Sequence, residues 1–375
     1  MYLELASRAG ASALKYDYKR KWFYISPKAK WKATIGLTFM TLQFIFGLVR
    51  CIGMDRENVY QFNVCVAFTF AALLPITAYL SQVFQAEDIA KLGNAMNEYA
   101  TIYRDNWVET YNTETLLAAD PLFLLARVFC LGSMGYFLFG AFLVYFWEDV
   151  PVFWISMVPK NTKNYRLIFY CFLIYGTYGY FLIPVVIVVL ILFTMAFSAL
   201  MIPIHYTEFN VKLPSSRHTT FPEFRSVAHL PTEYRKAELL HLYSMKVWGI
   251  YILPFQVLAM QFVLYTNFVL IRNWDHLGAL TRSLLLCWTI AIQIFWYFVL
   301  HVGGHFYLYA KANRDSWKFM VVKDSWEAKY MSKFRKSTRP LGIGHQGYFI
   351  IKPLSVLKFF KGVVKGTIRV LLTIK

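Results

Sequence analysis

The sequence predicts an all-α, polytopic membrane protein with seven transmembrane helices, a cytosolic N-terminus and an extracellular C-terminus. Of its 375 residues, 58% are hydrophobic and only 16% are charged, whereas about a quarter of a soluble domain is charged. The apolar residues gather in stretches long enough to cross a bilayer, and Lys and Arg gather in alternate connecting segments. This composition excludes a disordered, collagenous or nucleic-acid-binding protein.

Each predicted span has about 20 or more apolar residues, because every backbone amide within a bilayer must be hydrogen-bonded inside its own segment. The seven stretches are 33–53, 59–84, 121–147, 167–203, 247–271, 283–309 and 353–374. The fourth stretch is too long for one perpendicular span and contains no polar turn. We therefore expect Pro184 to kink a single tilted helix that projects past the membrane.

The orientation follows from the positive residues, because cytosolic loops of membrane proteins are enriched in Lys and Arg. Segments 1–32, 85–120, 204–246 and 310–347 hold 25 Lys and Arg residues in total. Loops 54–58, 148–166 and 272–282 hold six. The first group is therefore predicted to be cytosolic, and an odd number of spans then places the C-terminus outside.

The predicted cytosolic segments carry their own helical patterns. Residues 85–118 place apolar side chains on one face of a helix, namely Ile89, Leu92, Met96, Tyr99 and Tyr103. Residues 232–246 behave similarly with Leu239, Leu240 and Leu242. Both helices are expected to extend membrane spans into the cytosol. The basic, Trp-containing segment 311–341 fits either an amphipathic helix at lipid headgroups or an intracellular oligomerisation helix.

Cysteine and histidine patterns give no cofactor site. The five cysteines lie in apolar stretches and are interpreted as buried thiols: Cys51, Cys65, Cys130, Cys171 and Cys287. His301 and His305 are four residues apart, which puts both imidazoles on one helical face, as metal binding needs. The remaining histidines are scattered, so no metal and no cofactor are predicted. Gly303 and Gly304 are expected to let a neighbouring segment approach closely.

The C-terminal tail carries a recognisable ending. A basic segment with Trp317 and Trp326 leads into FRKSTRPLGIGHQGYFIIKPLSVLKFFKGVVKGTIRVLLTIK. This order resembles the arthropod seven-helix chemoreceptors, the odorant and gustatory receptor superfamily. The final GVVKGTIRVLLTIK aligns without a gap on the ending of the odorant co-receptor, and Thr367 with its hydrophobic run is similar to the gustatory ending. Ile368 replaces the gustatory Tyr, and the gustatory Gln-Phe is absent.

The resemblance covers the whole chain in topology and residues 311–375 in sequence. It implies a ligand-gated ion channel, non-selective for cations, in the plasma membrane of a sensory neuron dendrite. It also implies a homotetramer, or a heterotetramer with related subunits, opened by an odorant or tastant. The corresponding parts are a cytosolic basic N-terminal arm (1–32), transmembrane helices one to six with the ligand pocket (33–309), a cytosolic anchor helix and turn (310–347) and a pore-lining terminal helix (348–375).

The implied ligand pocket lies in the outer halves of the spans. Aromatic side chains with polar tips are frequent there, and such side chains can enclose a small apolar ligand and offer it a few hydrogen bonds. The predicted ligand-binding residues are Tyr136, Phe139, Phe142, Tyr170, Tyr175, Tyr178, Trp288 and Phe295. Ordinary helix packing or an interfacial aromatic belt is the alternative interpretation of each of them.

The terminal helix has two faces. The resemblance places Val370 and Ile374 at the hydrophobic gate of the pore, where an apolar ring blocks ions by dewetting. Helical spacing puts Val363 and Thr367 on the same face.

The opposite face of the terminal helix carries a row of cations, Lys358, Lys361, Lys365 and Arg369, within a segment, 352–375, that holds no acid. We expect this row to point away from the pore axis, into water-filled crevices or toward headgroups, and to tune permeation.

Three alternatives remain at this stage. A seven-helix receptor that signals through a partner would need the opposite orientation, and Trp147, Glu148 and Asp149 end the third span in place of an acidic-Arg-Tyr triplet. A membrane transporter usually shows paired interrupted helices or intramembrane acids. Within the superfamily, the short segment 204–232 lacks the long insertion of co-receptors. This argues against a dedicated co-receptor, and the absence of the gustatory Gln-Phe ending leaves both the odorant and the gustatory branch open.

Overall fold

The computed structural model describes residues 2–54, 59–108, 153–159, 164–174, 197, 200–345 and 347–373, and it is mostly helical. Its helices are α1 (Tyr2–Ala9), α2 (Pro27–Gly53), α3 (Val59–Phe84), α4 (Ala86–Trp107), α7 (Tyr165–Ile174), α9 (Leu230–Arg272), α10 (Ala279–Ser316), α11 (Ser325–Ser337) and α12 (Ser355–Thr373). Short 3₁₀ turns are η1 (Trp154–Met157), η5 (Ser215–Arg217), η6 (Pro222–Arg225), η7 (Trp274–His276) and η8 (Trp317–Phe319), and η4 (Ile204–Glu208) is a π-helical turn. Two antiparallel hairpins pair β1 (Leu14–Asp17) with β2 (Trp22–Ile25) and β3 (Gly344–His345) with β4 (Phe349–Ile350).

Four described helices are long and apolar enough to cross a membrane. They are Pro27–Gly53, Gln61–Phe84, Leu230–Arg272 and Thr281–Phe319. They correspond, in order, to the predicted spans 33–53, 59–84, 247–271 and 283–309. The prediction that these four stretches form apolar helices is therefore confirmed. Much of their apolar surface is exposed, as a lipid-facing surface requires. The predicted span 121–147 and most of 167–203, including Pro184, lie outside the described residues.

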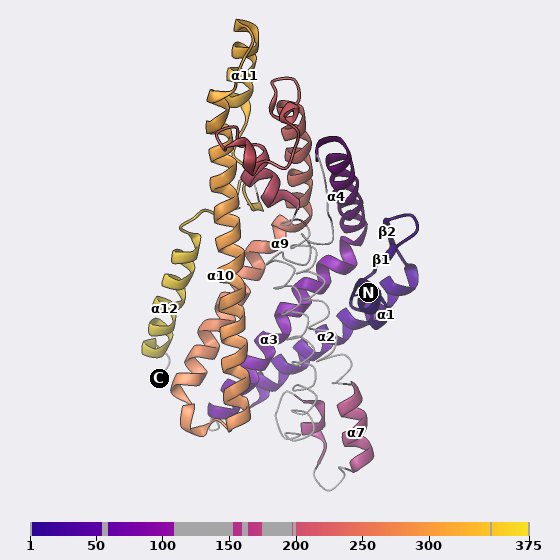
Figure 1. Ribbon diagram of the computed structural model, residues 1–375. Coiled ribbons are helices and arrows are strands. Elements are labelled where there is room, and N and C mark those ends of the chain that lie inside the picture. Colours follow the sequence, from indigo (N-terminus) through magenta and orange to yellow (C-terminus); the bar gives the residue numbers. More distant parts are fainter. Residues whose placement is uncertain are drawn as a thin grey trace.

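Helices α9 and α10 run side by side along the length of the molecule (Figure 1). With 43 residues, α9 is about 65 Å long at 1.5 Å per residue, which is roughly twice the thickness of a bilayer's hydrocarbon core. The prediction that residues 232–246 extend a span is therefore confirmed. The buried face of this extension differs from the predicted one, because Leu240 is buried and Leu239 is exposed.

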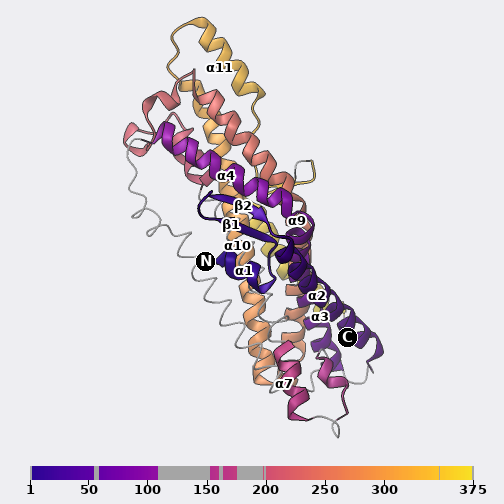
Figure 2. The ribbon, with the colours of Figure 1, turned by 90° about the vertical axis from the view of Figure 1, so that its right-hand side faces the viewer.

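The ends of α4, α9 and α10 come close together near α11 (Figure 2). Side chains from these helices form the largest hydrophobic cluster of the described residues, here called the distal core. Its central aromatic residues are Phe209, Phe224, Tyr234, Trp317 and Phe334. The apolar face predicted for 85–118 is confirmed in α4, which packs into this core and ends at Trp107. The predicted anchor segment 310–347 divides into the end of α10, the turn η8, α11 and hairpin strand β3.

The basic N-terminal arm is folded against the helices. In hairpin β1–β2, the amide N–H of Phe23 donates to Asn94 Oδ1 of α4 at 2.6 Å, and Asn94 Nδ2 donates back to the Phe23 carbonyl at 2.9 Å. A Cβ added to Gly93 would lie 2.9 Å from the Phe23 ring, so the close contact needs glycine. Helix α2 begins at Pro27 rather than at residue 33, because the arm leads directly into it.

Candidate pore and ligand sites

Helix α12 lies against α9 through a face with two glycines. A Cβ added to Gly362 would lie 2.7 Å from Met260 Cε, and one added to Gly366 would lie 2.6 Å from Leu264 Cδ2. One turn further, Asn267 Nδ2 donates to the Thr367 hydroxyl at 3.2 Å. These contacts join the middle of the terminal helix to α9.

The residues predicted to line the pore have different positions. Val363 is 5% exposed and packs in a cluster that contains Val263 of α9 and Trp296 of α10. Thr367 makes the hydrogen bond to Asn267, and Val370 is half-buried beside the cluster around Phe68. Ile374 lies outside the described residues. Within one subunit, the face of α12 that carries Val363, Thr367 and Val370, which was predicted to line the pore, therefore packs against neighbouring helices.

The cation row lies on the exposed side of α12. Lys358, Lys361, Lys365 and Arg369 are all exposed, and none of them pairs with an acidic side chain among the described residues. Leu357, Val364, Ile368 and Leu372 are exposed beside them. The four cations also explain why α12 is not among the apolar span candidates, although it lies where a span was predicted.

The segment that enters α12 touches α10 at two glycines. A Cβ on Gly303 would lie 2.9 Å from Ile351 Cγ2. A Cβ on Gly304 would lie 2.9 Å from Pro353 Cα and 3.2 Å from the Lys352 carbonyl oxygen. The prediction that these glycines admit a close neighbour is confirmed, and the neighbour is the segment that leads into the terminal helix.

The histidine pair beside these glycines is exposed. The rings of His301 and His305 lie 4.4 Å apart between centroids. Among the described residues, no group of three or more His, Cys, Asp or Glu side chains could hold a metal ion. The pair therefore has no further metal ligand within the described part of the chain.

The structure places three of the eight predicted ligand residues. Trp288 of α10 is half-buried, with its ring 5.2 Å from Phe68 of α3. Phe295, two turns further along α10, packs against Phe255 at 6.2 Å. Tyr170 is 61% exposed on α7. The other five, Tyr136, Phe139, Phe142, Tyr175 and Tyr178, lie outside the described residues.

Several residues near Trp288 were not among the predicted ligand residues. Phe68 also lies 6.5 Å from Phe153, which joins the segment before α7 to this cluster. The Tyr265 hydroxyl donates to Asn63 Oδ1 at 2.9 Å, and the buried amide nitrogen of Asn63 has no hydrogen-bond partner in the described part of the chain. The sequence signal for Asn63 was a polar amide within the apolar stretch 59–84. Such a residue is a candidate ligand contact, because a few precisely placed polar groups give a mostly apolar pocket its specificity.

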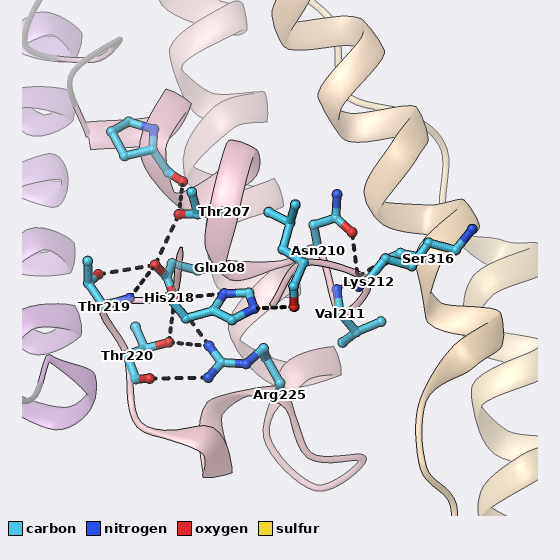
Figure 3. A network of polar contacts seen from close by, with 12 residues as sticks. Thr207, Glu208, Asn210, Val211, Lys212, His218, Thr219, Thr220, Arg225 and Ser316 are labelled. Carbon is cyan, nitrogen blue, oxygen red and sulfur yellow. Dashed lines mark hydrogen bonds and ion pairs between the residues drawn. The ribbon is translucent and has the colours of Figure 1, made fainter. Parts of the chain in front are cut away.

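A buried polar network lies beside the distal core (Figure 3). The carboxylate of Glu208 accepts hydrogen bonds from Thr207, Thr219 and Thr220 and from Arg225 Nη1 at 3.2 Å. Burial raises the pKa of Glu208, but these hydrogen bonds outweigh it and hold the pKa below its ordinary value. The neighbouring Val211 amide donates to Ser316 Oγ at 3.3 Å. The network therefore fixes the connection between the fourth predicted span and α9 against the end of α10.

No protein-family model matches the sequence, and no curated protein matches it. Among solved structures, the insect olfactory receptor OR5 from Machilis hrabei in complex with eugenol matches with a TM-score of 0.69 and 11% identity, over 100% of this chain and 97% of that chain. A second structure of OR5 matches with a TM-score of 0.64 and 10% identity over the whole of both chains. This chain has the insect olfactory receptor fold. The resemblance indicated by the tail is thus confirmed as a likeness of fold over the whole chain.

Two histidines, His205 and His241, are buried in this fold, and burial strongly lowers the pKa of each. Burial lowers the pKa of His205 from 6.5 to about 3 and that of His241 to about 4. Both lie outside the predicted spans, and both pack on Phe306 of the distal core. A histidine with a lowered folded pKa contributes stability that is fully present above its unfolded pKa and is lost as the pH falls toward the folded value.

We therefore expect the purified protein to lose stability as the pH falls from 6.5 to 4, by about 1.4 kcal/mol per pH unit for each of the two histidines. Thermal unfolding across this range would measure the effect. His241→Phe keeps an aromatic ring against Phe306 and should flatten the pH dependence, whereas His276→Gln, at an exposed position, should leave it unchanged. An unchanged slope in His241→Phe would contradict the assignment.

Proposed function

We propose that this chain is a subunit of a ligand-gated ion channel of the odorant and gustatory receptor type, opened by a small chemical ligand and non-selective for cations. The agreement with the OR5 fold over the full chain length is the observation that carries this proposal. One of the OR5 structures holds eugenol, a small aromatic molecule, which supports a ligand of similar size. In this function the chain conducts ions and catalyses no reaction.

The proposed topology has seven spans, a cytosolic N-terminus and an extracellular C-terminus in the plasma membrane of a sensory neuron. The four apolar helices and the bias of Lys and Arg support it. The proposed assembly is a homotetramer or a heterotetramer with related subunits. Its anchor is the distal core, to which α11 contributes Met331 and Phe334.

The proposed ligand pocket lies between α3, α10 and the predicted third and fourth spans. Trp288 and Phe295 supply its α10 side, and Phe68 and Asn63 of α3 are added to the residues predicted from the sequence. The amide nitrogen of Asn63, which finds no partner among the described residues, supports a polar contact in this region, because a buried donor without a partner is costly.

The proposed pore is lined by α12, with Val370 and Ile374 at its hydrophobic gate. The contacts of α12 with α9 and α10 support a role for Val363 and Thr367 in holding this helix in position. The exposed cations then lie close enough to the conduction path to act on permeating ions through the electric field.

Expression of the chain alone, with current recording against a panel of odorants and tastants that includes eugenol, tests the proposal. Unitary current steps in excised patches support a homomeric channel, and currents that require a related subunit support a heteromer. A second-messenger response without unitary currents would indicate a receptor that signals through a partner. Saturable flux without current steps would indicate a transporter.

Removing two cations of the row is expected to change ion selectivity. In Lys361→Gln/Lys365→Gln, the loss of positive charge should favour cations and shift the reversal potential in a tenfold NaCl gradient by on the order of 10 mV. Lys329→Gln on α11, also exposed, is the matched control and should behave as the unaltered channel. Identical reversal potentials in all three channels would refute a role of the row in permeation.

A further inference from the structure

Two of the cysteines face each other across α2 and α3. Cys51 lies in the last turn of α2 and Cys65 in the second turn of α3, and their Sγ atoms are 3.2 Å apart. Both are free thiols. The interpretation of the cysteines as buried thiols holds for Cys65 and is wrong for Cys287, which is exposed; Cys51 and Cys171 are half-buried.

The surrounding contacts hold both sulfur atoms in place. The Thr69 hydroxyl donates to the Cys65 carbonyl at 2.8 Å and lies 3.8 Å from Cys51 Sγ. Cys65 Sγ lies 3.9 Å from the Gly47 carbonyl, one turn before Cys51. A Cβ on Gly47 would collide with Thr69, so glycine lets the two helices come this close. The pair is thus positioned by the packing of α2 on α3 rather than by a flexible loop.

We propose that Cys51 and Cys65 are a redox modification site that forms a reversible disulfide between the outer ends of α2 and α3. This inference rests on the orientation in the proposed function, which places both thiols at the extracellular side. Disulfides form and persist in that oxidising environment. A peroxide is the chemical class of oxidant that the site takes.

The exposure of the two thiols sets the order of the steps. Cys51 is half-buried and Cys65 is fully buried, so Cys51 meets hydrogen peroxide first. Its thiolate attacks one peroxide oxygen, giving a sulfenic acid and, after protonation of the leaving hydroxide, one water. Cys65 then attacks the Cys51 sulfur and displaces the second water. The balance is two thiols and one peroxide to one disulfide and two waters.

The disulfide would act on the proposed ligand pocket through α3. Cys65 belongs to the same buried cluster as Phe68, and Trp288 of α10 packs against that cluster. A cross-link restricts the motion of the outer end of α3 before the ligand binds, so less conformational entropy is lost on binding. We expect reduction of the disulfide to raise the ligand concentration for half-maximal current by roughly 3-fold.

Peptide mapping of the full-length protein tests the modification without reliance on channel activity. Intact cells expressing the chain are treated with hydrogen peroxide, their free thiols are blocked with N-ethylmaleimide, and the protein is digested without reduction. A peptide linked through Cys51 and Cys65 that disappears with dithiothreitol is the expected result. Maleimide on both residues after peroxide treatment would overturn the proposal.

Variants separate this proposal from the proposed function. Cys51→Ala and Cys65→Ala should each abolish the linked peptide and the effect of dithiothreitol on current, whereas Cys287→Ala should preserve both. If the linked peptide forms in a chain that conducts no current, the proposed function fails and the modification site stands. If the peptide forms in purified protein but never on intact cells, the extracellular placement fails and the proposal with it.

Discussion

Replacement of Trp317 by alanine is expected to destabilise the protein by about 3–5 kcal/mol, the usual range for a buried large aromatic residue. Trp317 is 3% exposed, and its ring packs edge-on against Tyr234 at 4.9 Å and against Phe334 at 5.1 Å. Its indole N–H donates to the Phe209 carbonyl at 3.0 Å. Alanine would leave a cavity and an unsatisfied buried carbonyl where α9, α10 and α11 meet.

Trp326 provides the control on the neighbouring helix. It is 69% exposed, and among the described aromatic residues its ring stacks on Tyr330 alone, so Trp326→Ala should change the stability by no more than about 0.5 kcal/mol. Thermal unfolding of both detergent-solubilised variants, with their yield of monodisperse protein, would measure the difference. Equal unfolding temperatures for the two variants would mean that the distal core does not determine the stability.

Helices were predictable from the sequence wherever the length and apolar composition of a segment determine that it forms a helix. The stretch 59–84 coincides with α3, because a bilayer allows few alternatives to a long apolar helix. The apolar face of α4 was also predictable, since a period of 3.6 residues places Ile89, Leu92 and Met96 on one side.

Contacts between distant segments were not predictable from one sequence. Phe23 and Asn94 are 71 residues apart, and neither carries a local signal for the hairpin contact that joins them. The pairing of Cys51 with Cys65 depends on the register of α2 against α3. Periodicity separated the two faces of α12 correctly, but it could not tell which face meets α9.

The distal network shows the same limit for polar residues. The sequence predicted no structural role for Glu208 or Arg225, which contributed only to the charge counts. Both are buried in one polar network. A charge in a cytosolic segment is usually solvated, and only the fold reveals that three threonines surround this carboxylate.

Replacement of Gly304 by leucine is expected to abolish most of the ligand-evoked current while the protein still reaches the cell surface. The Cβ alone would lie 2.9 Å from Pro353 Cα and 3.2 Å from the Lys352 carbonyl. Because both atoms belong to the backbone, no side-chain rotation can relieve the overlap, and the entry to α12 must shift. Overpacking of this kind costs about 1–3 kcal/mol, on the order of 5- to 150-fold in a conformational equilibrium.

Gly53 at the end of α2 is the matched control, because a Cβ there would meet no atom of the described residues within 4 Å. Current recording combined with surface biotinylation should show Gly53→Leu close to the unaltered channel and Gly304→Leu strongly impaired, with Gly304→Ala in between. This graded series follows from steric overlap at the start of α12, and a helix so displaced loses its register against Met260 and Leu264 as well. Full current in Gly304→Leu would show that gating does not depend on the position of the terminal helix against α10.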